Sequence, residues 1–515
     1  MATQALISVT VLADHNEYKI NLSVGSTVQQ ALKIAAVSLA ETDKVEPILS
    51  TVLEDHTQVV VRRVKEEFYT EQVVLSFEHQ ELKNEALPEG ERRLSQAGMN
   101  GLEEITYRRL FEDGVVVATN VFTTTILQEP KPEIEMVGTR SMTEAIALPG
   151  TLGYISAGNA WLIQSTTANR KLVISTGDLD GRIFSLSLDG KYLLFTRFIT
   201  TPESINSLWL ADIKSEPIRI QDLKVNNVIH FAAFNDASTR LAFSTADWQV
   251  GAPGWRANND LSELMIYPDG TIASPEQILA PSAGGVYGWW GTEYAWSPDG
   301  LKFLFMRPDR VGIFDRQSET ETSIVDIEPY QTGGNWAWTP SAAWSPDGKA
   351  VYTVDHVENG TAGLVESQRF DLITLPSAGG AIKTLVKDVG MFAQPVPSPD
   401  FRSAGEFESL PGENNDQAEY SVAYLQSLQP GKSDTSTYRL SSISQWGTDQ
   451  KDLFPNAGEE GITPQRVAWS PTSVDEAGNF GIALVYKGNI WIIDAGTVIA
   501  QQITRDGLTT RIDWR

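Results

Sequence analysis

Ala-Trp-Ser-Pro-Asp-Gly occupies residues 295–300 and returns unchanged at residues 343–348. Weaker copies stand at Ala468 to Pro471 and at Pro397 to Asp400. Each complete copy follows one short apolar stretch and precedes another, such as Lys302 to Met306. Proline presets φ at the second position of a turn, and the Asp-Gly pair tolerates turn geometry that other residues resist. The phrase therefore predicts a strand, a tight turn and a second strand.

The spacing of these copies predicts a repeated unit. They recur at roughly 45 to 70 residues, a period typical of one four-stranded sheet reused in a β-propeller. Aligning weaker copies on the tryptophan gives six internal units, and the aligned positions are Leu186, Phe234, Trp296, Trp344, Pro397 and Trp469. We therefore expect a mainly β fold with a propeller over residues 150–515.

The two ends of this region predict one more unit. Arg511 to Trp514, close to the C-terminus, mirrors Arg182 to Ser185 near the beginning of the repeats. Residues 510–515 are then expected to supply the innermost strand of a blade whose three outer strands come from residues 152–176. Such an arrangement removes the open sheet edge. Seven blades is the favoured count, with six or eight as the alternatives.

The repeats resemble those of the TolB-like and WD-repeat-like propeller families of bacteria, from Leu152 to the C-terminus. The resemblance implies a propeller fold and leaves the ligand open, since one fold hosts many functions. The Trp-Ser-Pro-Asp-Gly turns are expected to be structural. Their tryptophans would lie in the core between blades, and their Asp-Gly pairs would form the turns.

Residues 64–140 differ in pattern. They lack the turn phrase and carry short motifs around Gly90, Gly98, Gly101, Gly114 and Gly138. These glycines and their neighbours resemble the five-glycine domain of bacterial surface proteins. The resemblance implies a thin, elongated β module with little core, found in adhesins and beside peptidoglycan-active enzymes. It also implies binding to polymers that contain N-acetylglucosamine.

The first module covers residues 4–63. Ala5 to Leu12 and Glu17 to Leu22 alternate between apolar and polar residues in the manner of a hairpin. Ser26 and Gln29 form a capping-box pattern that predicts a helix over residues 27–36. Together with a returning strand at residues 59–61, these elements resemble the small ubiquitin-like module that precedes the five-glycine domain in resuscitation-promoting factors.

Composition excludes several classes of function. The chain has 515 residues, which fits three modules. Its net charge of −26 argues against nucleic acid, because binding phosphates needs a basic face. The absence of cysteine excludes disulfides, thiolate metal sites and a cysteine nucleophile. No apolar run is long enough to predict a transmembrane segment.

Localisation is inferred from the resemblance alone. The stretch from Met1 to Ser8 has neither the basic start nor the apolar segment of a signal peptide. The family resemblance nevertheless implies an extracellular or cell-surface protein. We therefore expect the native export signal or lipoprotein segment to be absent from this chain.

Catalytic and metal-binding patterns are weak. Ser156 lies in an expected outer strand with the wrong glycine spacing for a hydrolase nucleophile. Two acidic stretches, Asp178 to Gly181 and Asp355 to Asn359, are candidates for calcium, although Asp-Gly is also ordinary turn chemistry. No catalytic residue and no cofactor are predicted, with calcium as the alternative. The histidines are isolated from one another and form no metal pair: His15, His56, His79, His230 and His356.

Aromatic residues give a stronger signal. They crowd three Gly-rich segments near residues 247–260, 284–292 and 331–340, and strand counting sends these segments to the face opposite the turns. Tryptophans in such loops stack on sugar rings or anchor a protein partner; the alternative is that they pack on one another to order long loops. The candidate ligand-binding residues are Trp248, Trp255, Arg256, Tyr287, Trp289, Trp290, Arg307, Asp309, Arg310, Trp336, Trp338, His356 and Glu358.

The function expected from these patterns is a non-catalytic, exported bacterial cell-envelope protein. Its N-terminal modules would bind the wall as an arm or stalk, and its propeller would present a recognition face for a cell-wall polysaccharide or an envelope protein. One alternative is a carbohydrate-active enzyme, a lyase or glycosidase, with its acids among Asp247, Asp260, Glu293 and Asp309. Another is a structural subunit of a surface layer or filament.

Overall fold

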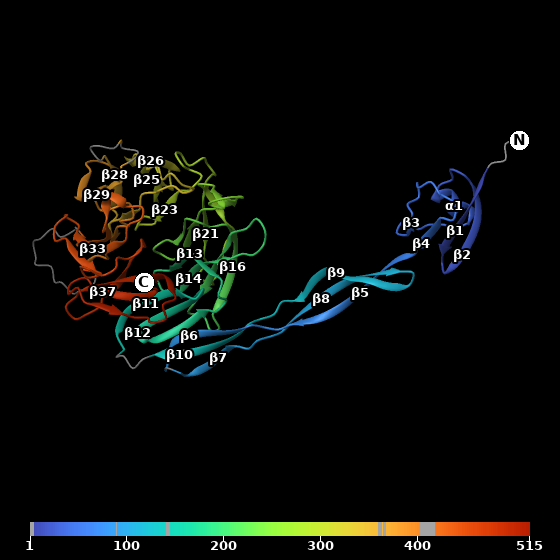
Figure 1. Ribbon diagram of the computed structural model, residues 1–515. Helices are drawn as coiled ribbons and strands as arrows, with labels where there is room; N and C mark the ends of the chain where they lie inside the picture. The colour runs from blue at the N-terminus through green and yellow to red at the C-terminus, as the bar shows by residue number, and fades with distance from the viewer. Residues whose placement is uncertain (1–4, 89, 141–144, 359–362, 364–366, 402–417) are drawn as a thin grey trace, which may run out of the picture. The chain divides into compact units, whose positions relative to one another are not determined.

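The structure is a computed structural model that describes residues 5–88, 90–140, 145–358, 363, 367–401 and 418–515. This described part is nearly all β-structure, with one α-helix, α1 (Val28–Ile34). The chain divides into two compact units, drawn in Figure 1. The first consists of residues 1–82 and 92–137, and the second of residues 83–91 and 138–515.

A four-stranded sheet packed with α1 begins the first unit. Its order is β2-β1-β4-β3, with β1 parallel to β4. Alternate residues of β1 enter the core, where Val9 and Val11 are buried with Val28 of the helix. The strands are β1 (Leu6–Ala13), β2 (Asn16–Ser23), β3 (Lys44–Glu46) and β4 (Gln58–Arg62).

The capping box of α1 is shifted by one residue from the predicted pair of Ser26 and Gln29. The backbone N–H of Thr27 donates to the side-chain oxygen of Gln30 at 3.0 Å. Ser26 Oγ instead donates to the carbonyl oxygen of Ser23 at 2.8 Å, so its hydroxyl belongs to the preceding turn. The helix also ends before Ala36, whose φ of 54° is left-handed.

Two three-stranded sheets follow, β5-β8-β9 and β6-β10-β7. Nearly every residue of β5 and β9 is exposed, so that sheet is held by its hydrogen-bond ladder more than by a core. A Cβ at Gly98 would lie 2.3 Å from the Phe77 ring, which explains why that position requires glycine. The strands are β5 (Val64–Leu75), β6 (His79–Pro88), β7 (Arg92–Gln96), β8 (Gly101–Glu112), β9 (Val115–Gln128) and β10 (Glu133–Arg140).

Within its described residues, the second unit contains six antiparallel four-stranded sheets, most of them built from consecutive strands. The first is β13-β14-β15-β16, and the second is β17-β18-β21-β22, which a hairpin, β19-β20, interrupts. Their strands are β13 (Leu179–Leu186), β14 (Tyr192–Phe198), β15 (Asn206–Asp212), β16 (Arg219–Asn226), β17 (Ala232–Phe234), β18 (Arg240–Phe243), β19 (Ala246–Trp248), β20 (Trp255–Ala257), β21 (Leu261–Met265) and β22 (Glu276–Leu279).

The other four sheets are β23 to β26, β27 to β30, β31 to β34 and β35 to β38, each in sequence order (Figure 1). Their strands are β23 (Glu293–Trp296), β24 (Lys302–Arg307), β25 (Arg310–Asp315), β26 (Thr320–Asp326), β27 (Ala342–Trp344), β28 (Ala350–Val357), β29 (Arg369–Pro376), β30 (Lys383–Val386), β31 (Val396–Pro397), β32 (Ser421–Ser427), β33 (Tyr438–Ser444), β34 (Lys451–Phe454), β35 (Ala468–Ser473), β36 (Phe480–Tyr486), β37 (Asn489–Asp494) and β38 (Ala500–Gln502).

The two ends of this unit share one sheet of order β12-β11-β39. Trp514 of β39 pairs with Leu152 of β11. The expectation that residues 152–176 supply three strands is wrong, because β12 runs unbroken for 16 residues and three strands form this sheet among the residues that the structure describes. The strands are β11 (Ala147–Ser156), β12 (Asn159–Ile174) and β39 (Thr509–Trp514).

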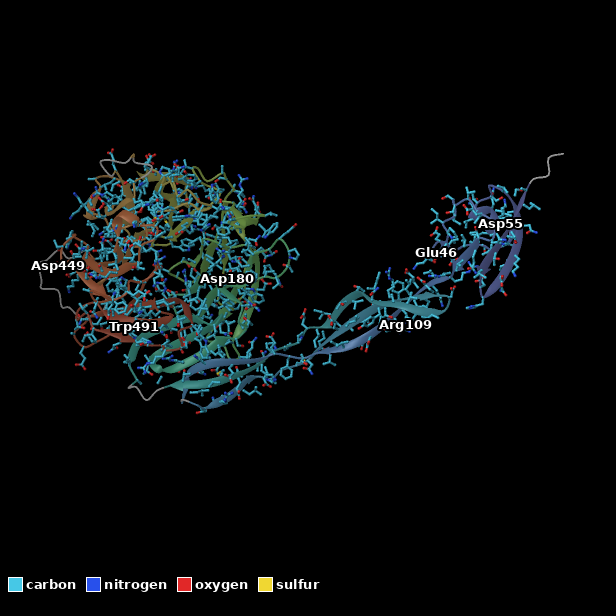
Figure 2. The ribbon with its side chains drawn as sticks, in the orientation of Figure 1. Glu46, Asp55, Arg109, Asp180, Asp449 and Trp491 are labelled. Carbon is cyan, nitrogen blue, oxygen red and sulfur yellow. The ribbon has the colours of Figure 1, made fainter. Side chains whose placement is uncertain are left out.

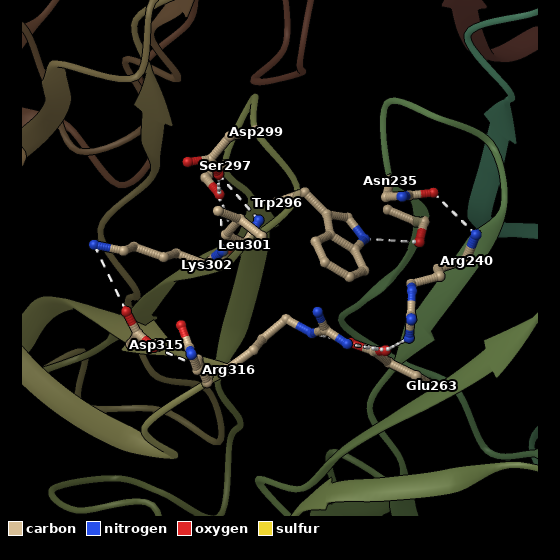
Figure 3. Close-up of polar contacts among 12 residues, drawn as sticks. Asn235, Arg240, Glu263, Trp296, Ser297, Asp299, Leu301, Lys302, Asp315 and Arg316 are labelled. Carbon is tan, nitrogen blue, oxygen red and sulfur yellow. Dashed lines mark hydrogen bonds and ion pairs between the residues drawn. The ribbon is translucent and has the colours of Figure 1, made fainter.

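The repeated turn is held by its own side chains (Figure 3). Ser297 Oγ donates to Asp299 Oδ1 at 2.5 Å and accepts the backbone N–H of Lys302 at 2.9 Å. Gly300 follows with a φ of 67°, in the left-handed region that favours glycine. The second complete copy repeats the bond between Ser345 and Asp347, so the phrase encodes one local structure.

The tryptophan of the turn packs between sheets, as the sequence predicts. Its indole N–H donates to a carbonyl oxygen in the first strand of the preceding sheet, a contact that Figure 3 shows for Trp296. This bond recurs around the unit and explains why the residue is tryptophan and not another apolar residue. The donor and acceptor pairs are Trp296 with Ala233, Trp344 with Ala295, and Trp469 with Val396, at 3.1, 3.3 and 2.8 Å.

Candidate functional site

The hairpin β19-β20 carries the first candidate residues. It is inserted between β18 and β21, the second and third strands of their sheet, where strand counting predicts it. Trp248 pairs with Trp255, and Asp247 pairs with Arg256, so each pair shares one face of the hairpin. Trp248 and Arg256 are exposed, whereas Trp255 is half-buried. The hairpin therefore presents an indole surface to solvent.

The loop at residues 282–292 is fastened to the hairpin by Asn259, which is 2% exposed. Its side-chain nitrogen donates to the carbonyl oxygen of Gly288 at 2.8 Å, and its oxygen accepts the hydroxyl of Thr292 at 2.8 Å. A Cβ at Gly284 would lie 2.4 Å from this amide, so the loop requires glycine there. Asn259 was not among the predicted site residues, although the Asn-Asn pair at 258–259 marks it in the sequence.

Three tryptophans meet where the hairpin and the loop join. The rings of Trp255 and Trp290 lie 5.4 Å apart, and Trp289 meets Trp290 edge-on at 5.9 Å. The backbone N–H of Ala257 donates to the carbonyl oxygen of Trp289 at 3.0 Å, which links the two segments. We call Trp248, Trp255, Trp289 and Trp290 the tryptophan cluster. Trp255, Trp289 and Trp290 are thus brought together, and Trp248 joins them through its pairing with Trp255.

Arg182 and His230 lie against the tryptophan cluster and were not among the predicted site residues. The guanidinium carbon of Arg182 lies 4.8 Å from the centre of the Trp255 ring. His230 Nε2 donates to the carbonyl oxygen of Trp290 at 2.6 Å. Burial, together with the nearby charge of Arg182, lowers the pKa of His230 to about 4. The imidazole is therefore neutral at pH 7, and Arg182 carries the positive charge.

Tyr287, Asp309 and Arg310 lie at the edge of the same loop. Tyr287 is half-buried, and its φ of 52° places it in the left-handed region. A Cβ at Gly285 would lie 3.4 Å from Asp309 Oδ2, so this carboxylate borders the loop. Arg310 pairs with Asp309 at 2.8 Å and keeps part of its side chain in solvent. These three residues can contribute to the rim of a site.

Arg307 is a structural residue and not part of an open face. It is 8% exposed and donates two hydrogen bonds to the Glu321 carboxylate, at 2.9 and 2.6 Å. Its Nε donates to the Thr292 hydroxyl at 3.2 Å, so it supports the end of the 282–292 loop. The prediction that it contacts ligand is wrong, because its donors are used inside the protein.

The candidates near residues 331–358 are also mostly core residues. Trp338 is 1% exposed and donates to the carbonyl oxygen of Met391 at 2.9 Å. His356 is 3% exposed, and both of its ring nitrogens lie against backbone carbonyl oxygens. Trp336 is half-buried and stacks on Phe392 at 6.3 Å. Placing Trp338 and His356 on an exposed face was therefore wrong, because strand counting cannot tell a loop that folds inward from one that projects. Trp336 is half-buried, as Trp255 is, and its role stays a prediction.

Glu358 is exposed just after β28 and has no described partner. Asn359, the end of one candidate calcium stretch, lies outside the described residues. In the same stretch, burial and the charge of Asp371 raise the pKa of Asp355. A raised pKa disfavours the carboxylate form that calcium needs.

The other candidate calcium stretch is satisfied by protein donors. Asp180, labelled in Figure 2, accepts bonds from Thr196 and from Asn206 Nδ2, the latter at 2.8 Å. Asp178 forms an ion pair with Arg197 at 2.8 Å. A search of the described residues for three or more clustered acids, histidines or cysteines found no group able to hold a metal.

The four acids considered for catalysis have different settings. Asp260 is 5% exposed and accepts both the N–H and the hydroxyl of Thr245, so it braces the hairpin. Asp309 pairs with Arg310. Asp247 is exposed on the hairpin. Burial raises the pKa of Glu293 against the opposing effect of Arg466 and Arg511.

Comparison with known proteins identifies one module. A family model for the G5 domain matches residues 66–140, and residues 66–140 are therefore a G5 domain. This region is similar to the solved G5 domain of HP0197, at 25% identity, with 15% of this chain and 99% of that chain covered and a TM-score of 0.14. The match confirms the five-glycine resemblance. No helix among the described residues is long and apolar enough to span a membrane.

Other matches are to propeller-type structures. One is described as TolB from Agrobacterium tumefaciens, at 14% identity, covering 60% of this chain and 89% of that chain, with a TM-score of 0.33. Another is a chain of the nidogen/laminin complex, at 10% identity, covering 70% and 97%, with a TM-score of 0.36. A search of curated proteins found no match.

Proposed function

We propose that this chain is an exported, non-catalytic binding protein of the bacterial cell envelope, and that the tryptophan cluster recognises a glycan or protein ligand. One observation carries this proposal. Indoles from a hairpin and from a separate loop are assembled around Arg182 and His230, and Trp248 remains 38% exposed. Such an aromatic surface beside polar groups suits the apolar face of a sugar ring.

The N-terminal modules are proposed to act as a wall-binding arm or stalk. Residues 66–140 are a G5 domain, and G5 domains occur in extracellular bacterial proteins. We assign residues 4–63 to a ubiquitin-like module, supported by the β2-β1-β4-β3 sheet that packs with α1. We assign residues 64–140 to the five-glycine module. These assignments support an extracellular or cell-surface location.

Residues 150–515 are proposed to form a seven-bladed propeller that β39 closes. The first strands of neighbouring sheets touch one another, as expected for strands that surround a common axis. β13 contacts β17, and β17 contacts β23. β39 contacts both β35 and β13, which joins the last four-stranded sheet to the first. Together with the β11-β39 pairing, these contacts support a closed ring.

A non-catalytic role is supported by the way the candidate acids are used. Asp260 braces the hairpin, and Asp309 is paired with Arg310. The competing proposal of a lyase or glycosidase rests on Glu293, because burial raises its pKa toward the range of a general acid. Product formation from a bound glycan would favour that alternative.

Binding to a glycan array and to bacterial envelope extract tests the proposal. Trp255→Ala and Trp289→Ala should each weaken binding by about 1 to 3 kcal/mol, as expected for an aromatic anchor. Trp446→Ala is the matched control, because Trp446 is 55% exposed and outside the cluster. Equal binding by all three variants would contradict the proposed site. Self-association without ligand binding would favour the surface-layer or filament subunit.

A further inference from the structure

Three charged residues occupy one repeat position in three different sheets. Each residue lies three positions before a tryptophan: Glu293 before Trp296 of β23, Arg466 before Trp469 of β35, and Arg511 before Trp514 of β39. These strands are the proposed innermost strands of their sheets. Strand pairing agrees with this alignment. Each tryptophan lies opposite a fully buried residue of the neighbouring strand: Trp296 opposite Phe303, Trp469 opposite Ile482 and Trp514 opposite Leu152.

These residues act on one another although they are far apart in sequence. The charges of Arg466 and Arg511 both favour the ionised form of Glu293, while Arg466 and Arg511 repel each other. Both arginines reach solvent, yet the surrounding protein lowers the pKa of each. β39, which carries Arg511, contacts β35, which begins two residues after Arg466. This contact and the shared repeat position place Arg466 and Arg511 at one level near the proposed propeller axis, and both charges act on Glu293.

Arg182 belongs to the same region. It lies in β13, which contacts the β39 strand that carries Arg511. The backbone N–H of Leu186 in β13 also donates to Asp513 in β39 at 2.7 Å. On its other side, Arg182 covers the Trp255 ring. The tryptophan cluster and the arginines are thus connected through Arg182.

The positive charges of this region are poorly balanced. Within the described part of the chain, no carboxylate lies at ion-pair distance from Arg182, Arg466 or Arg511. Asp513 pairs with Arg515, at 3.6 Å. Asp513, itself paired with Arg515, and Glu293 are acids whose charges act on both Arg466 and Arg511, in a chain whose net charge is −26. Clustered like charges are unfavourable unless an anion balances them.

We infer that Arg182, Arg466 and Arg511, here called the arginine cluster, bind an acidic group of the ligand, and that the ligand is an acidic polysaccharide. A guanidinium group binds carboxylate, sulfate or phosphate oxygens through two parallel N–H bonds. The guanidinium group of Arg182 lies over the indole of Trp255, so an anion bound to it would lie beside the tryptophan cluster. The inference rests on the proposed function, because the tryptophan cluster supplies the surface for the sugar rings.

Glu293 carries the opposite charge to the arginine cluster and therefore gives a test of the anion site. Its carboxylate occupies the same repeat position as two of the arginines and competes with an incoming anion. Removing that charge should tighten anion binding, whereas removing Arg466 or Arg511 should weaken it. A purely structural role for these residues predicts no such opposite signs. Lys349→Gln is a matched control, because Lys349 is exposed beside a turn and the substitution also removes one positive charge.

The experiment measures binding of two acidic probes and their neutral forms by calorimetry. The probes are a galacturonic acid tetramer with its carboxyl-reduced form, and sulfated cellotetraose with unsulfated cellotetraose. At least one acidic probe should bind more tightly than its neutral form, and more weakly as salt rises. Arg466→Gln and Arg511→Gln should each weaken it by about tenfold, Glu293→Gln should tighten it, and Lys349→Gln should leave it unchanged. The preferred probe distinguishes carboxylate from sulfate ligands.

Other binding results would overturn either the anion site or glycan recognition. Equal binding of acidic and neutral forms, with loss in Trp289→Ala, would overturn the anion site and keep the proposed function. Acidic probes that bind all variants equally would also overturn it. If no glycan binds, sulfate is compared with chloride at matched ionic strength by thermal melting. A larger sulfate shift in the natural chain than in the Arg466→Gln, Arg511→Gln double variant supports the anion site and contradicts glycan recognition; equal shifts overturn the site.

Discussion

The guanidinium carbon of Arg182 lies 4.8 Å from the centre of the Trp255 ring, and the two residues come from neighbouring sheets. Arg182 is in β13, whereas Trp255 begins β20 of the inserted hairpin. Their contact therefore couples an exposed hairpin to a first strand near the proposed axis. A cation–π contact of this kind contributes about 0.5 to 2 kcal/mol. The site is preassembled by contacts within the protein.

Arg182→Met should loosen the hairpin without unfolding the second unit. Methionine keeps an apolar stem on the indole and removes the charge, so the loss is confined to the cation–π contact of about 0.5 to 2 kcal/mol. Hydrogen exchange should accelerate at residues 246–257, while the melting temperature stays within a few degrees. Unchanged exchange in the hairpin would show that Arg182 does not hold it.

His230 should make stability depend on pH in the acidic range. Its pKa is about 4 in the folded protein, below its ordinary value of 6.5, so folding favours the neutral ring. The contribution is complete above about pH 6.5 and is lost as the pH falls toward 4. Urea unfolding at about pH 7 and about pH 4.5 should show a loss of about 1 to 3 kcal/mol. His230→Gln should reduce this loss, and an identical pH dependence in the variant would contradict the assignment.

Asn259 should be more important for stability than its place in a loop suggests. Its φ of 52° and its bonds to Gly288 and Thr292 make two separate contributions. Asn259→Gly relieves the backbone strain but loses the bonds, at a cost of about 1 to 3 kcal/mol. Asn259→Ala should cost about 1 kcal/mol more, because alanine resists a left-handed φ. Chemical denaturation of both variants measures the difference, and equal costs would refute the strain component.

The tryptophans should separate into core and surface residues by their effect on stability. Trp338→Ala should lower the free energy of unfolding by about 3 to 5 kcal/mol, because a fully buried side chain leaves a cavity. Trp248→Ala should change it by less than about 0.5 kcal/mol, as expected for a surface position. Urea titration of the two variants tests this order. A large loss in Trp248→Ala would mean that the exposed indole has a structural role.

The sequence predicts repeated structure well and side-chain placement less well. The Trp-Ser-Pro-Asp-Gly turn is recognisable because proline, aspartate and glycine each satisfy a local backbone requirement. Gly90 and Gly114 of the G5 domain are equally local, since both have a positive φ, whereas Gly98 is required by the distant Phe77 ring. Trp338 and His356 were misplaced because burial depends on Phe370 and Met391, which lie in other parts of the chain. Arg466 and Arg511 were missed because their relation appears only when separate sheets are aligned in space.

Hydroxyl-radical footprinting with bound wall polysaccharide reports which side chains the ligand covers, and so tests whether the tryptophan cluster is the recognition surface. Trp248, Trp255 and Trp289 should be protected, with Trp446 modified equally in the free and bound protein. Protection of the turns at residues 297–300 and 345–348, with the tryptophan cluster modified as in the free protein, would instead place recognition on the turn side of the repeats.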